Sequence, residues 1–508
     1  MQISDKKIVF AGLARDIEPF LQQVRSNIEK YAAEFAQWSV ILVENDSKDR
    51  TKQLLRDWVN QATINGARHA ALIELDGLDA RHPLRTDRLA FARNQYLKHI
   101  ADCELKQFDY LAVLDMDAPN AFPTAMENFM AATRFLESRD DVAAVFPNQM
   151  PVYCDISALR EKDWCPDDCM DEILRTRGQI GSDAAIRKYI FDRQTFIDPK
   201  HEPIEVESAF GGIGIYKLPL ALQSTYIGLK ADGAEVCEHV AFHSAIRATG
   251  KKFFILPAFL NFTNFEVSDF GNHHALMPVI ANGRVVNLLA ARDHPFAALR
   301  ARFPLYAARF PHLAALYARA HSGSILDIGA GIGESLALCR IAGCNSNYLA
   351  VENRDPYYIL LSTNALLHRG LFAGHRLVRE LAELPGLDDT GIGLIKLDTD
   401  DATSFLTRDV AHFAENHPVL WMKALSKGDW AETLSSLSRI YKFVMAFDNF
   451  GFAVLSGALD DVKDHLVKLL DDVRDQRAYA ISGKIEYLEL VFFGANTGDL
   501  YEEFRSTL

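Results

Sequence analysis

Short apolar runs alternate with helical patterns in two separate stretches of this 508-residue chain. In the first stretch, apolar runs and helical patterns follow one another at 7–13, 17–38, 39–44, 49–59, 88–100 and 110–114. In the second, apolar runs recur near 325–328, 348–352, 393–398, 419–423, 442–447 and 487–493. Such alternation is typical of mostly parallel sheets covered by helices on both faces. The sequence therefore predicts the α/β class, with two Rossmann-like, doubly wound domains.

The chain length favours two to four domains, because a single hydrophobic core stops growing beyond about 250–300 residues. We assign residues 1–275 to a first domain and residues 322–508 to a second. Residues 276–321 include an Ala- and Arg-rich run that is interrupted by Pro304 and Pro311. Because proline marks helix starts or kinks, we expect this range to be a helical connector.

Charge, hydropathy and cysteine content limit the kinds of partner and the cellular setting that we expect for this protein. The formal net charge of -14 would repel phosphate backbones, which argues against nucleic acid as a partner. No apolar run reaches the ~18–20 residues that span a bilayer, so we expect any membrane contact to be peripheral, at the inner face. The seven cysteines are widely spread and odd in number, which indicates a reducing cytoplasm and no disulfide framework.

An Asp-x-Asp pair ends the apolar run at 110–114. Asp115 and Asp117 follow this run directly, at the position where open α/β sheets bind ligands. Hard oxygen ligands of this kind suit Mn²⁺ or Mg²⁺ bridging a diphosphate. The alternative is a loop with two solvated carboxylates, because Asp398-Thr-Asp400 matches the same short pattern.

Two further segments give the Asp-x-Asp pair a context. The turn Glu44-Asn-Asp46-Ser follows an apolar run and precedes a helical pattern, and Arg88 to Arg93-Asn lies on the helix before the Asp-x-Asp run. In this order the segments resemble GT-A glycosyltransferases over about residues 5–265, and most of all their capsule-associated mannosyltransferase branch. The resemblance implies a GDP- or UDP-linked sugar donor, held near Glu44, Asp46, Arg88 and Arg93 and by the metal.

The same resemblance implies an acceptor side. The glycine-rich segment 206–217 is similar to the acceptor-side segment of these enzymes, and Glu238 is the first candidate for an acid that serves catalysis or acceptor binding. His239 and His243 would share a helix face, and we assign His243 to the metal shell. The alternative is that both histidines make ordinary polar contacts. A zinc site is less favoured, because the cysteine spacing is irregular at Cys154, Cys165 and Cys169.

Alternating glycines follow the apolar run that ends near Asp327. Gly329, Gly331 and Gly333 would let the backbone turn tightly and approach a ligand closely. About twenty residues on, Glu352 ends another apolar run, where an acid binds ribose hydroxyls. Both dinucleotide and S-adenosylmethionine enzymes use this arrangement, and the Gly-x-Gly-x-Gly spacing favours S-adenosylmethionine.

Residues 325–494 resemble the FkbM-type class I methyltransferases, which methylate hydroxyls of sugars and related compounds. The segment 353–364 and the run from Leu394 to Asp398 carry this resemblance, which places Asp398 near the methyl donor as a catalytic residue. Two features depart from the family. The family usually continues as Asp-x-Glu-Gly, whereas this chain has Asp400-Asp401 and no glycine, and the run ending at Lys423 lacks the expected acid. These departures make cofactor binding a firmer expectation than methyl transfer.

Together these patterns favour a bifunctional transferase of bacterial surface-polysaccharide or glycan biosynthesis. One domain would transfer a sugar to a glycan or glycolipid, and the other would O-methylate a sugar. A second hypothesis keeps the glycosyltransferase active and gives the methyltransferase-like domain a docking role. A third is a non-catalytic, nucleotide-binding scaffold, and a redox enzyme with a dinucleotide cofactor is a further alternative.

Overall fold

The structure is a computed structural model that describes residues 3–121, 126–263, 271, 273–281, 284–294, 307–384, 391–399, 418–424, 429–480 and 483–508. It divides into two compact units, Met1–Asn272 and His273–Leu508, close to the expected boundary at residue 275. Each unit contains one eight-stranded sheet with helices packed against it. The predicted α/β class is therefore confirmed for both units.

The first unit begins with the predicted alternation of strand and helix. Its elements up to the Asp-x-Asp pair are β1 (Lys7–Ala14), α1 (Glu18–Ala32), β2 (Gln37–Glu44), α2 (Thr51–Ile64), β3 (His69–Glu74), α3 (Leu78–Arg81), α4 (Arg85–Asp102) and β4 (Tyr110–Asp115). The later elements are α5 (Ala118–Ala121), α6 (Met126–Glu137), β5 (Val142–Met150), α7 (Cys169–Ile180), α8 (Ser182–Tyr189), β6 (Ile204–Val206), β7 (Ile213–Lys217), α9 (Leu218–Ala221), α10 (Glu238–Arg247) and β8 (Lys252–Phe262).

The strand order of this sheet is β3-β2-β1-β4-β7-β5-β8-β6. The pairs that join β1, β2, β3 and β4 are parallel, whereas β7 runs antiparallel to both β4 and β5. The sheet is therefore mixed. The parallel register pairs Leu13 with Asp115, so the carboxyl ends of β1 and β4 meet at the same edge.

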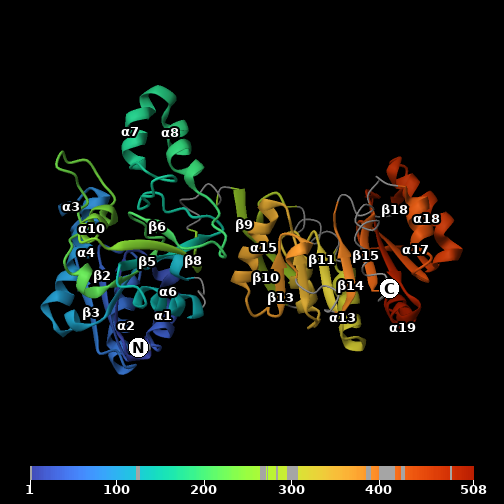
Figure 1. Cartoon of the computed structure of the whole chain (residues 1–508), viewed down its shortest axis with the longest axis horizontal. Coiled ribbons are helices and arrows are strands. Elements are labelled where there is room, and N and C mark those ends of the chain that lie inside the picture. The colour runs from blue at the N-terminus through green and yellow to red at the C-terminus, as the bar shows by residue number, and fades with distance from the viewer. Residues whose placement is uncertain are drawn as a thin grey trace. The chain divides into compact units, whose positions relative to one another are not determined.

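Strand β1 shows why these runs are apolar throughout. Val9 and Ala11 belong to one buried cluster, and Ile8 and Phe10 belong to the cluster on the opposite face. Because side chains alternate between the faces of a strand, a strand covered on both sides needs apolar residues at every position. On one side of this unit, α7 and α8 form a helical hairpin that extends away from the sheet (Figure 1).

The second unit contains a hairpin, the sheet and its covering helices. Its strands are β9 (His274–Ala281), β10 (Arg284–Ala291), β11 (Ser324–Ile328), β12 (Tyr348–Val351), β13 (His375–Val378), β14 (Ile392–Leu397), β15 (Val419–Ala424), β16 (Phe443–Asp448), β17 (Ala453–Ala458), β18 (Tyr479–Ala480), β19 (Gly483–Lys484) and β20 (Leu488–Phe493). Its helices are α13 (Arg309–Ala320), α14 (Glu334–Ile341), α15 (Asp355–Leu367), α17 (Trp430–Leu437), α18 (Leu459–Arg474) and α19 (Gly498–Ser506). The strand order is β13-β12-β11-β14-β15-β20-β16-β17, with β11 to β15 parallel and β20 antiparallel to its neighbours.

The predicted helical connector at 276–321 is wrong in its first part. Strands β9 and β10 pair antiparallel there, with the β-branched Val279 opposite Val286. Such residues fit a pleated strand better than a helix. Strand β10 belongs to the second unit, because Leu289 exchanges backbone hydrogen bonds with the Asn364 side chain of α15. The expected helix is present at α13, and 295–306 lie outside the described residues.

Candidate functional sites

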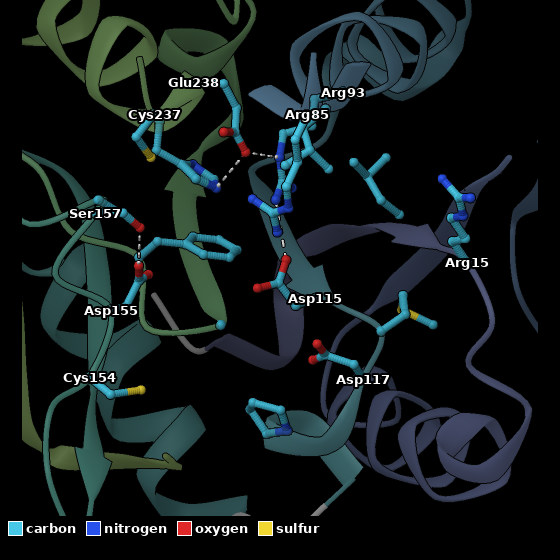
Figure 2. Close-up of a pocket in the computed structure, with 18 of the residues that line it drawn as sticks. Arg15, Arg85, Arg93, Asp115, Asp117, Cys154, Asp155, Ser157, Cys237 and Glu238 are labelled. Atoms are coloured by element: carbon cyan, nitrogen blue, oxygen red, sulfur yellow. Dashed lines mark hydrogen bonds and ion pairs between the residues drawn. The ribbon is translucent and has the colours of Figure 1, made fainter. Parts of the chain in front are cut away.

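A cavity of about 770 Å³ opens at the carboxyl ends of β1 and β4 in the first unit. Asp115 and Asp117 line it together with Glu238, and four arginines contribute from β1 and α4 or the loops beside them: Arg15, Arg85, Arg88 and Arg93. Figure 2 shows Asp115 and Asp117 between Arg15 on one side and Asp155 on the other. The predicted Asp-x-Asp pair thus lies in a pocket of ligand size.

Asp115 is surrounded by other charged groups. Its Oδ1 lies 3.2 Å from Nη2 of Arg93, and its backbone N–H donates to the Gly212 carbonyl at 2.9 Å. Burial is the largest cause that raises the pKa of Asp115 to about 7, and the negative charges of Asp117 and Asp155 add to it. A divalent cation would relieve this crowding of carboxylates, so the pair fits a metal.

The donor set for such a metal is small. In the described part of the chain, no group of three or more His, Cys, Asp or Glu side chains is arranged to hold a metal ion. Two carboxylates are still a sufficient protein contribution for Mg²⁺, which usually completes its coordination with water and substrate phosphates. The arrangement therefore suits a metal that binds together with a diphosphate.

Arg93 links two carboxylates at the cavity wall. Its Nε donates to Oε1 of Glu238 at 3.0 Å while Nη2 contacts Asp115, and both Arg93 and Glu238 are buried. The guanidinium carbon lies 5.3 Å from the centre of the Phe210 ring and 5.7 Å from that of Tyr226. Arg93 is therefore held rigidly in place. The sequence does not reveal the contact between Arg93 of α4 and Glu238 at the start of α10, because β4 and other elements separate the two helices along the chain.

The structure does not bring His243, the expected third metal ligand, to the two aspartates. Its side chain is buried, with Nδ1 2.8 Å from Oγ of Ser208 and Nε2 2.9 Å from the Tyr216 hydroxyl. Burial, followed by the charge of Arg93, lowers the pKa of His243 to about 3. With both ring nitrogens engaged, His243 has a structural role here. Its neighbour His239 lines the cavity instead, stacked on Phe210.

Glu44 and Asp46 organise the turn after β2. Glu44 is buried, accepts the Ser47 N–H at 2.9 Å and lies 3.3 Å from Nζ of Lys52. Asp46 has a φ of 53° and accepts backbone N–H groups of Gly77 and Asp79 at 2.6 and 2.9 Å. The neighbouring Asn45 lines the cavity. Glu44 and Asp46 thus hold the turn in place, and of these three residues only Asn45 is among those that line the cavity.

Three cavity residues were missed by sequence reasoning. Nη1 and Nη2 of Arg15 donate hydrogen bonds to the two carboxylate oxygens of Asp79, each at 2.7 Å. Nε of Arg88 lies 3.1 Å from Oδ1 of the same carboxylate. Arg85, at the start of α4, has no ion-pair partner in the described ranges and is therefore available to an anionic ligand. Asp155 lines the opposite end of the cavity. Nothing in the local sequence around Arg15, Arg85 or Asp155 marks them, because only the fold brings them together.

The glycine turn of the second unit has the backbone that the spacing predicts. Gly329, Gly331 and Gly333 have φ angles of 78°, 59° and 89°, which favour glycine. At Gly329, a Cβ atom would lie 2.1 Å from the Asp398 carbonyl oxygen. The turn between β11 and α14 therefore packs directly against the end of β14.

The acids around this turn form ion pairs. Asp327 is buried, accepts the Tyr348 hydroxyl at 2.7 Å and binds Nζ of Lys396 at 3.0 Å. Asp398 lies 3.4 Å from Nζ of Lys423 and 3.8 Å from that of Lys396. Burial opposes ionisation of Asp398, but the two lysines outweigh burial and lower its pKa. Asp398 is thus ionised at the edge expected for a methyl donor, whereas Asp400 and Asp401 lie outside the described residues.

Glu352 makes four hydrogen bonds. Oε1 accepts from the backbone N and from Nε of Arg354 at 3.0 and 2.8 Å. Oε2 accepts from the Gly331 N–H and from Nη2 of Arg354 at 2.9 and 2.8 Å. A carboxylate offers about four acceptor positions. The glycine turn fits an adenosyl cofactor, but its ribose would have to replace Arg354 at Glu352.

None of the helices in the described ranges combines the length and hydropathy needed to cross a bilayer. No protein-family model matches the sequence, and no curated protein matches it.

Comparison with solved structures gives matches of low sequence identity. The chain is similar to the mannosyltransferase PcManGT from Pyrobaculum calidifontis in complex with GDP-Man and Mn²⁺, at 14% identity and a TM-score of 0.30, over 51% of this chain and 57% of that one. It is similar to S. aureus TarS 1-349 at 11% identity and a TM-score of 0.30, over 51% and 63%. Precorrin-6y C5,15-methyltransferase from Geobacter metallireducens GS-15 matches at 14% identity and a TM-score of 0.23, over 37% and 87%.

The chain thus spans 57% of the PcManGT chain and 63% of the TarS chain.

Proposed function

We propose that the first unit transfers a sugar from a GDP- or UDP-linked donor, with Mn²⁺ or Mg²⁺ as cofactor. One observation supports this above all: Asp115 and Asp117 line a cavity of about 770 Å³ that has arginines on one side. A nucleoside diphosphate presents the anionic oxygens that both a metal and arginines bind. The metal, held by Asp115 and Asp117, would offset the charge on the departing diphosphate.

The chain's own residues would orient the donor. Arg85 is free to contact the diphosphate, while Asp79 holds Arg15 and Arg88 at the cavity wall. Arg93 keeps Asp115 in place through their ion pair. Glu238 lines the cavity at the other end of the Arg93 bridge, and we retain it in the proposed catalytic machinery as an acid that holds Arg93 and borders the acceptor.

The acceptor that we propose is a hydroxyl of a glycan or glycolipid in surface-polysaccharide assembly. A glycolipid would require peripheral contact with a membrane, which the extended hairpin of α7 and α8 could make (Figure 1). The family resemblance and the position of Glu238 at the cavity support this acceptor.

Hydrolysis of a nucleotide-sugar panel in Mn²⁺ tests the donor assignment. We expect the full chain to turn over one donor, and we expect Asp117→Ala to lower that turnover by at least about 100-fold, because one of two metal carboxylates is lost. Asp163→Ala is the matched control, since Asp163 is 83% exposed and pairs only with Lys162 in the described ranges. Full activity of Asp117→Ala in Mn²⁺, or no donor turned over by the wild type, would refute the assignment.

For the second unit we propose S-adenosylmethionine binding and O-methylation of a sugar. The supporting observation is the turn in which Gly329, Gly331 and Gly333 all have positive φ beside the ionised Asp398. When bound, the cofactor would supply an electrophilic methyl group. Asp398 would hold the methyl acceptor, and Lys396 and Lys423 keep it charged. Calorimetric binding of S-adenosylhomocysteine tests the cofactor, and a lack of any affinity would favour the docking role.

A further inference from the structure

The two ends of the cavity in the first unit differ in charge. Its basic lining residues all come from segments before residue 94, at the carboxyl ends of β1 and in α4. Cys154, Asp155 and Ser157 lie on the side of the cavity opposite Arg15 (Figure 2). The lining residues that come from later segments also include Ile186, Ile190 and Phe191, and the described lining residues after Arg93 include no Lys or Arg. An anionic donor therefore fits the first end, and an uncharged acceptor fits the second.

Asp155 is the carboxylate of the acceptor end. It follows β5 and lies across the cavity from Arg15, with Asp115 and Asp117 between them (Figure 2). Its Oδ2 accepts the Gly211 N–H at 2.9 Å, and its Oδ1 accepts the Ser157 hydroxyl at 3.2 Å. These bonds hold the carboxylate in position and leave acceptor capacity on it.

The other cavity carboxylates already have cationic partners or a proposed metal. Glu238 is bound to Arg93, and Asp115 is bound to Arg93 and assigned to the metal with Asp117. Asp155 forms no ion pair with Lys, Arg or His in the described ranges. A carboxylate that is held by neutral donors, without a cation, is free to accept a proton from a substrate.

We propose that Asp155 is the general base of sugar transfer, and this rests on the proposed function of the first unit. The acceptor O–H proton passes to Asp155 as the acceptor oxygen forms a bond to the anomeric carbon. The bond from that carbon to the diphosphate oxygen breaks, and its electron pair leaves with the nucleoside diphosphate. One displacement of this kind inverts the anomeric configuration.

The environment of Asp155 suits this role. Burial is the largest influence on it and raises its pKa above the usual range, with the charge of Glu238 acting in the same direction. A general base works best when its pKa is near the working pH. The hydrogen bonds from Gly211 and Ser157 hold Asp155 in position and act to lower its pKa, but burial and the charge of Glu238 outweigh them and make Asp155 more basic.

Azide rescue tests the proposal, because azide attacks without giving up a proton. In Mn²⁺ and the donor that the wild type hydrolyses, we expect Asp155→Ala to lower hydrolysis about 100-fold or more. Sodium azide should restore nucleoside diphosphate release in Asp155→Ala and yield a glycosyl azide of inverted configuration. Asp117→Ala should not respond to azide, because it lacks a metal carboxylate.

Two further measurements separate a base from a structural residue. Asp155→Asn and Asp155→Ala should bind the nucleoside diphosphate with Mn²⁺ within about twofold of the wild type. The acidic limb of the wild-type kcat/KM profile should be absent from the azide reaction of Asp155→Ala. Glu238→Gln serves as the comparison variant and should show no azide rescue.

Several outcomes would overturn the proposal. Failure of azide to restore Asp155→Ala, rescue of Glu238→Gln instead, or a glycosyl azide of retained configuration would each exclude Asp155 as the base. These results would leave the glycosyltransferase assignment intact as long as the wild type turns over a donor. A wild type that turns over no donor would refute both.

Discussion

Arg354 occupies Glu352, the residue at which the ribose of the proposed cofactor would bind. It supplies three of the four hydrogen bonds on Glu352, and its side chain is half exposed. We predict that Arg354→Ala tightens binding of S-adenosylhomocysteine by about three- to tenfold, since ribose hydroxyls would no longer compete with a guanidinium that is worth roughly 1 kcal/mol at such a site. Isothermal titration calorimetry measures this. Arg379→Ala, which removes a nearby arginine bound to Asp355, should leave the affinity unchanged. Weaker binding by Arg354→Ala would instead make Arg354 part of the ligand site.

The turn between β11 and α14 is the element on which the second site depends. A Cβ atom at Gly329 would lie 2.1 Å from the Asp398 carbonyl oxygen, so Gly329→Ala must separate the turn from β14. We predict that it abolishes S-adenosylhomocysteine binding and destabilises the second unit by about 3 kcal/mol or more. Gly343→Ala is the matched control, because Gly343 has a φ of 93° but no atom within 4 Å of the added Cβ. Gly343→Ala should lower the free energy of unfolding, measured in urea, by only about 1 kcal/mol. Equal losses of stability in the two variants would show that the turn can rearrange to accommodate a Cβ atom at position 329.

At the scale of the whole molecule, each unit has its own sheet and its own buried clusters. Within the described part of the chain, two buried clusters of the first unit contain residues up to 259, and one buried cluster of the second unit begins at Leu326. We therefore predict that Asp117→Ala leaves the affinity for S-adenosylhomocysteine within about twofold of the wild type. We also predict that Gly329→Ala leaves the rate of donor turnover within about twofold of the wild type. Calorimetry and the donor assay on the same full-length variants measure this. If a substitution in one unit changed binding or turnover in the other unit by more than about fivefold, the two sites would be coupled by a free energy of roughly 1 kcal/mol.

The apolar runs predicted most of the central strands correctly. Runs such as Tyr110–Asp115 are buried on both faces, so their composition is set by the strand itself and can be recognised locally. The hairpin of β9 and β10 was mistaken for a helix. Its outer positions are exposed and give no clear period, and its pairing depends on contacts with α15. The local sequence pattern did not predict this hairpin, because α15, which it contacts, lies far along the chain.

Sequence alone located the Asp-x-Asp pair and the alternating glycines, because each depends on a strand end and on backbone freedom within a few residues. Tertiary structure decided what surrounds them. Arg93 and Glu238 are 145 residues apart in the chain yet 3.0 Å apart in space, and Asp155 reaches the same cavity from another loop. His243 lies near the site but is committed to Ser208 and Tyr216. Such roles follow from the contacts of folded side chains, which residue type and spacing do not specify.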